Sequence, residues 1–224
     1  VGTLLVDTPI KLGIIPFGSG NGLARSLKIP KQIFSALNVI KAEHTKKIDV
    51  GLINQHCFFC NVSLGPTAKM VHYYNKNLKR GLTAYIQAIA KVLFKKSSLR
   101  TINLRVNEIQ TELQPDIFFI SNSGLIGYNF SLTPEASLGD GQLHLLYTDK
   151  MSFIEKLFFI YSVVTKKALK TGKIHRTKFE SLELFSIPKE KLLIQIDGES
   201  VLTHTHTLLI SIKKKALKVL VPKP

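Results

Sequence analysis

The chain has 224 residues, of which 45% are hydrophobic and 21% charged, and this composition excludes a disordered protein. Its 31 Lys and Arg against 15 Asp and Glu give a formal net charge of +16. Such an excess favours an anionic partner, such as a nucleotide, membrane headgroups or nucleic acid, although a merely solubilising surface charge is equally open. Two cysteines exclude a disulfide scaffold, and the most apolar helical stretch, 153–164, is too short to cross a bilayer.

The first informative element is an apolar run, 12–15, followed by a glycine-rich turn and the start of an amphipathic helix. Gly18 and Gly20 tolerate positive φ and allow a ligand to approach the main chain closely. Ser19 and Asn21 add short side chains that hydrogen-bond a phosphate or cap a helix. This pattern predicts a phosphate-binding turn, with an ordinary strand-to-helix loop as the alternative.

A second helix is expected at 32–42, and the chain changes character from Lys47 onward. Short strand-like runs with Gly, Asn and Asp turns then predict an antiparallel sandwich, interrupted by helical patterns at 68–95 and 153–169. The expected strands are 49–54, 56–63, 101–106, 109–113, 117–121, 142–147, 175–185, 192–196, 206–212 and 216–221. The fold class is therefore α/β plus β: a partial α/β lobe beside a larger antiparallel β-sandwich lobe that carries helices.

Asp197 and Glu199 flank Gly198 directly after the apolar strand 192–196. One carboxylate could accept a proton from a hydroxyl group while the other holds a magnesium ion. A plain Asp-Gly hairpin turn is the alternative explanation.

Four segments of this chain resemble, in the same order, motifs of the diacylglycerol kinase and sphingosine kinase catalytic superfamily. They are Pro16-Phe17-Gly18-Ser19-Gly20-Asn21-Gly22-Leu23-Ala24-Arg25, Ile48-Asp49-Val50-Gly51, Pro134-Glu135-Ala136-Ser137-Leu138-Gly139-Asp140-Gly141-Gln142-Leu143, and Ile196-Asp197-Gly198-Glu199.

The resemblance implies an ATP-dependent lipid kinase that uses Mg²⁺ and phosphorylates a lipid hydroxyl. It implies that the nucleotide lies near Gly18, Ser19, Gly20 and Asn21 and that Glu199 is the general base, with Asp197 as its catalytic partner. Gly22 stands where Asp is commoner, so no role is expected of an acidic side chain there.

A structural magnesium site is also implied by the resemblance, at Ser137, Asp140 and Gln142. A carboxylate together with hydroxyl, carbonyl and water oxygens suits this hard cation. An Asp-Gly turn before the strand 142–147 is the alternative.

By the same resemblance, residues 1–46 and 214–224 form the remnant of a nucleotide-binding lobe and residues 47–213 a lipid-binding lobe, with the active site between them. The family's earlier Gly-Gly-Asp-Gly-Thr loop does not occur in this sequence. We therefore expect a truncated piece of a longer enzyme, inactive by itself.

The expected partners are ATP, a lipid substrate and an anionic membrane surface, contacted peripherally from the cytoplasm. The membrane contact is expected at a basic helical cluster interleaved with tyrosines. Its cationic members are Lys76, Lys79, Arg80, Lys91, Lys95 and Lys96. No nucleic-acid recognition motif occurs, so nucleic acid is not expected, and an oligomer is open. The alternative function is a non-catalytic module on the same scaffold that binds anionic membranes or nucleic acid.

Overall fold

The structure is a computed structural model that describes residues 1–18, 20–76, 83–84, 87–88, 91, 101–106, 108–125, 131–165, 172–185 and 192–223. Ser19 and most of the expected basic cluster, namely Lys79, Arg80, Lys95 and Lys96, lie outside these residues. The described helices are η1 (Gly2–Leu5), α1 (Gly22–Ser26), α2 (Ile33–Lys41), α3 (Pro66–Lys76) and α5 (Phe153–Thr165).

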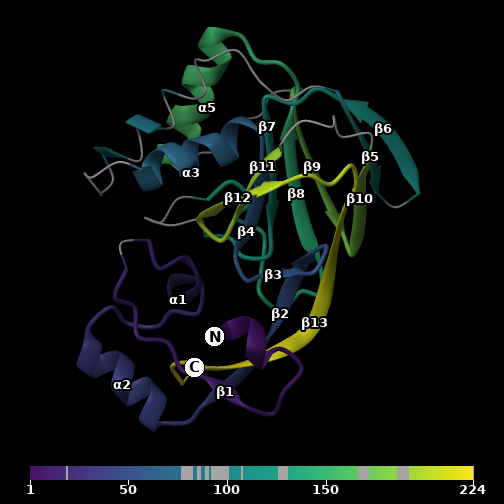
Figure 1. Cartoon of the computed structure of the whole chain (residues 1–224). Helices are drawn as coiled ribbons and strands as arrows, with labels where there is room; N and C mark the ends of the chain where they lie inside the picture. The colour runs from purple at the N-terminus through teal and green to yellow at the C-terminus, as the bar shows by residue number, and fades with distance from the viewer. Residues whose placement is uncertain are drawn as a thin grey trace.

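Two sheets contain the strands of the described residues (Figure 1). The first sheet runs β3 (His56–Phe58), β2 (Thr45–Ile53), β13 (Leu208–Leu220), β10 (Ser181–Phe185), β5 (Ile102–Val106) and β6 (Ile109–Leu113), and β1 (Lys11–Leu12) pairs parallel to β13. The second runs β12 (Glu199–Thr203), β11 (Leu192–Ile196), β4 (Asn61–Leu64), β7 (Ile117–Ser121), β8 (Leu143–Thr148) and β9 (Ile174–Phe179). Every pairing except that of β1 is antiparallel, which confirms the predicted α/β plus β-sandwich class.

The sandwich is held together by side chains that alternate inward from both sheets. Phe58, Phe118 and Phe179 are among the largest fully buried side chains, and all three belong to the same hydrophobic cluster. The Phe58 ring lies against Gly51 on the paired strand, where an added Cβ would come within 2.1 Å of the ring. Gly51 therefore makes room for the aromatic centre of the core.

Two runs predicted as single strands are each two strands in different sheets. The run 56–63 divides into β3 and β4 at Phe59 and Cys60, and the run 175–185 divides into β9 and β10 at Glu180. The sequence pattern alone does not reveal this change of sheet, because the chain is extended on both sides of each division. At each division the chain crosses from one sheet of the sandwich to the other.

A second hydrophobic cluster joins α1 and α2 to the far ends of β2 and β13. Figure 1 shows α1, α2 and both chain ends gathered below the sandwich, with α3 and α5 beside it at the upper left. The pairing of β2 and β13 shifts register between Lys213 and Leu217, near the expected lobe boundary. Because both strands run through the two clusters, the division at 46/47 and 213/214 stays a prediction.

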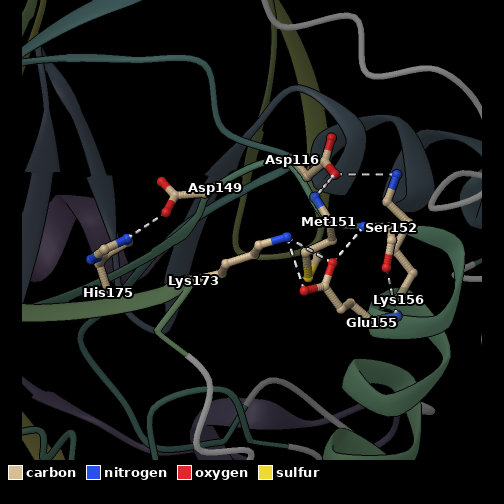
Figure 2. A network of polar contacts seen from close by, with 8 residues as sticks. All are labelled: Asp116, Asp149, Met151, Ser152, Glu155, Lys156, Lys173 and His175. Atoms are coloured by element: carbon tan, nitrogen blue, oxygen red, sulfur yellow. Dashed lines mark hydrogen bonds and ion pairs between the residues drawn. The ribbon is translucent and has the colours of Figure 1, made fainter.

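The start of α5 is fixed by a polar network (Figure 2). Ser152 and Glu155 form a reciprocal capping box, in which the Ser152 N–H donates to Glu155 Oε2 at 2.7 Å and the Glu155 N–H donates to Ser152 Oγ at 3.3 Å. Lys173 lies 2.9 Å from the Glu155 carboxylate, and Lys156 lies 3.2 Å from Asp116. These contacts secure the helix against the six-stranded sheet. None of the described helices is both long and apolar enough to cross a membrane.

Candidate functional site

The carboxylate of Asp197 binds the backbone at the point where the chain changes sheets between β3 and β4. Its Oδ2 accepts the N–H of Phe59 at 2.6 Å, and its Oδ1 accepts the N–H groups of Cys60 and Asn61 at 2.7 and 3.0 Å. These amides lie where β3 leaves one sheet and β4 enters the other. Asp197 therefore joins the β11–β12 turn to the β3–β4 turn.

The backbone of this turn is shaped for a two-residue hairpin, with positive φ at Asp197 (48°) and Gly198 (92°). Burial raises the pKa of Asp197 and the nearby Glu199 charge adds to this, although the three N–H donors act in the opposite direction. A carboxylate held by three amides is fixed in position and cannot swing toward a substrate.

Glu199 differs from Asp197 in its contacts, although both residues are exposed. It is exposed at the first position of β12, and within the described residues its carboxylate has no hydrogen-bond or ion-pair partner. Its neighbours are nevertheless fixed, because Asn75 Nδ2 of α3 donates to the Gly198 carbonyl at 2.8 Å and His72 Nδ1 lies 3.0 Å from Ser200 Oγ. Glu199 is thus an available carboxylate on a rigid support.

The glycine-rich turn is closed by Asn21. This residue adopts the left-handed conformation (φ 50°) directly before α1, its Oδ1 accepts the Gly18 N–H at 3.1 Å, and its Nδ2 donates to the Gly18 carbonyl. Gly20 has open space where a side chain would stand, and its carbonyl accepts the Nε–H of Arg25 at 3.0 Å. Asn21 therefore shapes the loop, while Gly20 leaves the main chain open to a ligand. The expected strand 12–15 is limited to β1 at Lys11–Leu12.

The third predicted group lies on the loop between β7 and β8. Asp140 Oδ2 lies 2.9 Å from Nε2 of the buried His144, and its Oδ1 accepts the Gln142 N–H at 3.2 Å. Ser137 is exposed on the same loop, and its carbonyl accepts the Asp140 N–H at 3.4 Å. One carboxylate with hydroxyl and carbonyl oxygens fits a magnesium ion that keeps several waters. Within the part of the chain that the structure describes, no three His, Cys, Asp or Glu side chains form a denser metal cluster.

Two buried residues to which the sequence assigns no site role connect these groups. Asp49, 1% exposed, accepts the N–H of Gly141 at 2.8 Å and that of Lys215 at 2.7 Å. Asn122, fully buried, donates to the carbonyls of Asp49 at 2.9 Å and Phe59 at 3.0 Å. Asp49 lies in a segment already noted for its resemblance, whereas Asn122 carries no signal in the sequence. Together they connect the 131–142 loop to the turn that holds Asp197.

Comparison with known proteins agrees with these motifs. Residues 1–53 match the family model of the diacylglycerol kinase catalytic domain. Over these residues the chain is similar to that catalytic domain.

Curated relatives extend the similarity along most of the chain. The diacylglycerol kinase of Staphylococcus haemolyticus is 28% identical over 193 residues, which are 84% of this chain and 57% of the relative. The diacylglycerol kinase of Staphylococcus aureus is 26% identical over 191 residues, 84% of this chain and 60% of the relative. The chain thus spans less than two thirds of the length of these relatives.

Solved structures share the fold. The crystal structure of a diacylglycerol kinase from Bacillus anthracis superposes with a TM-score of 0.69 at 18% identity and covers 95% of this chain and 67% of that one. A second crystal structure from the same organism superposes with a TM-score of 0.75 at 20% identity, covering 95% of this chain and 68% of the other. At these identities the likeness shows the architecture of this chain.

Proposed function

We propose that this chain functions as an ATP-dependent lipid kinase, which transfers the γ-phosphoryl group of ATP to the hydroxyl group of a lipid. The observation that carries the proposal is the contrast within the Asp197-Gly198-Glu199 turn between one fixed carboxylate and one available carboxylate. The names of the relatives favour diacylglycerol or a similar lipid alcohol as the acceptor.

In this mechanism Glu199 is the general base. As the lipid oxygen bonds to the γ-phosphorus and the bond to the leaving β-phosphate oxygen breaks, the hydroxyl proton passes to Glu199. Asp197 holds the turn through its three amide contacts, so that the base meets the hydroxyl in a constant position.

The nucleotide is proposed to bind at Gly18, Ser19, Gly20 and Asn21, where the main chain at Gly20 is open and Asn21 keeps the loop closed. Magnesium is proposed at Ser137, Asp140 and Gln142, as a structural ion on the 131–142 loop. When bound, the ion would neutralise the Asp140 carboxylate and stiffen a loop that Asp49 already ties to β2 and β13.

We further propose that the protein meets an anionic membrane from the cytoplasm through α5. This helix exposes Phe153 by 62%, Ile154 by 64%, Phe158 by 56% and Tyr161 by 56%, while its other face packs on the sheet through Phe159. An apolar, aromatic face on a chain with a net charge of +16 fits a bilayer that carries acidic headgroups.

The decisive experiment assays ATP-dependent phosphorylation of diacylglycerol and sphingosine by the protein that the complete gene encodes. Glu199→Gln is expected to lower kcat by about 10²- to 10⁴-fold with a normal melting temperature, because it removes the base and no contact of the fold. Glu112→Gln, an equally exposed carboxylate on β6, is the control and should retain full activity. Full activity of Glu199→Gln would refute its role.

A further inference from the structure

A cavity of about 560 Å³ opens beside the six-stranded sheet, away from Asp197 and Glu199, which do not line it. It runs from α1 to α5, past the loops around residues 123–125 and 131–138. Its size falls within the range of about 300–1,000 Å³ that is typical of small-molecule sites.

The deep wall of this cavity is apolar. Leu146 and Phe159 are buried there, at 0% and 5% exposure, and Leu132, Val163 and Ile174 pack against them. Leu146 belongs to the outer face of the sheet, because its neighbour Leu145 points into the sandwich core instead. A wall made mainly of aliphatic side chains, with the single ring of Phe159, fits an acyl chain.

The outer edge of the cavity is cationic. Lys28, Lys46 and Arg176 are exposed there and Arg25 is half-buried, against a single lining carboxylate, Glu135. Arg176 stands directly across the strand pair from Leu146, so the cationic edge and the apolar wall meet within one cross-strand pair. Charge at the entrance and hydrocarbon at depth match a molecule with an anionic head and an apolar tail.

Two hydroxyl groups in the wall also lack partners. Ser26 Oγ, at the end of α1, and Ser131 Oγ are both buried, and neither has a hydrogen-bond partner within the described residues. A buried hydroxyl without a partner costs free energy, which head-group oxygens at this wall would recover. These hydroxyls therefore point, independently of the charges, to a polar ligand group near α1.

From these observations we infer that the cavity is a binding site for a single-chain anionic amphiphile, a long-chain carboxylate or an alkyl phosphate, separate from the proposed phosphoryl-transfer residues. The head group contacts the cations and the two serine hydroxyls, and the tail lies along Leu146 and Phe159 toward α5. Arg25 lines the cavity and also donates to the Gly20 carbonyl, so an occupied site contacts a residue that holds the glycine-rich loop.

The test measures binding of dodecyl phosphate, laurate and the neutral dodecanol by titration calorimetry, below their micelle concentrations and in low salt. The two anions should bind at least about tenfold more tightly than dodecanol, and the tighter anion identifies the head group. Lys46→Gln combined with Arg176→Gln should weaken the anions by about tenfold. Lys31→Gln combined with Lys47→Gln is the control. It has the same net charge as the first double variant, but it alters exposed lysines outside the cavity and should leave binding unchanged.

A second variant probes the tail. Ser162→Leu places a larger side chain of α5 in the cavity and leaves less room for the tail, so it should weaken the binding of all the anionic probes. Circular dichroism and the melting temperature confirm that this variant keeps the fold. Equal affinity for dodecanol and the anions would overturn the inference. So would an equal loss of affinity in the Lys46/Arg176 and the Lys31/Lys47 double variants. Because binding is the only readout, this result is independent of kinase activity.

Discussion

At the scale of single residues, the candidate site separates two tasks that an Asp-Gly-Glu sequence does not distinguish. Both residues are exposed, but Asp197 accepts three backbone N–H groups at the division between β3 and β4, whereas the Glu199 carboxylate is unpaired within the described residues. An amide at a strand crossover has no ladder partner, and a buried donor without a partner is costly. Asp197 therefore contributes to the fold as well as to the site.

This difference predicts that two neutralising substitutions change the stability of the protein to different extents. Asp197→Asn should lower the free energy of unfolding by about 2 kcal/mol, because the new NH₂ group faces a backbone donor where a carboxylate oxygen stood. In a chain of this size the melting temperature would fall by roughly 4–8 °C, measured by calorimetry. Glu199→Gln should leave it within about 1 °C of the original value, since it is a surface substitution. A stable Asp197→Asn protein would show that the three contacts do not support the turn.

At the scale of elements, the sequence predicts most strands and helices but not their partners. The strands β5, β6, β7 and β11 match the expected runs closely, because their hydrophobic patterns and the turn residues beside them mark them locally. The splits at Phe59–Cys60 and at Glu180, and the hairpin partner β12, depend on contacts between distant segments. The same reason hides Asn122 from sequence analysis, because its role is to join two backbone carbonyls that lie far from it in the chain.

The α5 cap gives a pH-dependent prediction at this scale. Lys173 and the Ser152 contacts lower the pKa of Glu155 from its ordinary 4.5 to about 2. A carboxylate whose pKa is lower in the folded state stabilises that state above about pH 4.5. This stabilisation is lost as the pH falls toward 2. The melting temperature of Glu155→Gln should therefore lie below that of the unmodified chain at pH 6, and the gap should narrow at pH 3. The control Glu112→Gln is expected to show no such gap, and a constant gap for Glu155→Gln would contradict the ion pair's role.

At the scale of the whole molecule, the sandwich core and the cluster around α1 support different candidate sites. The cluster around α1, β2 and β13 supports the glycine-rich turn, and the sandwich core supports the Asp197–Glu199 turn. The outer face of the six-stranded sheet carries a third cluster, and α5 covers it while leaving its own opposite face apolar and exposed. A long-range charge of +16 adds attraction to any acidic surface that this face approaches.

The membrane contact is tested by co-sedimentation with vesicles of phosphatidylcholine, with and without phosphatidylglycerol. Ile154→Ser combined with Phe158→Ser removes two exposed α5 side chains one turn apart and should lower partitioning into acidic vesicles more than about tenfold, because two apolar side chains no longer leave water. Ile109→Ser combined with Phe34→Ser removes the same two residue types at 67% and 82% exposure on β6 and α2, and should leave partitioning unchanged. All these variants keep the net charge, so raising the salt concentration should weaken binding in each of them. Equal losses in both pairs would mean that overall hydrophobicity, and not the α5 face, determines the contact with lipid.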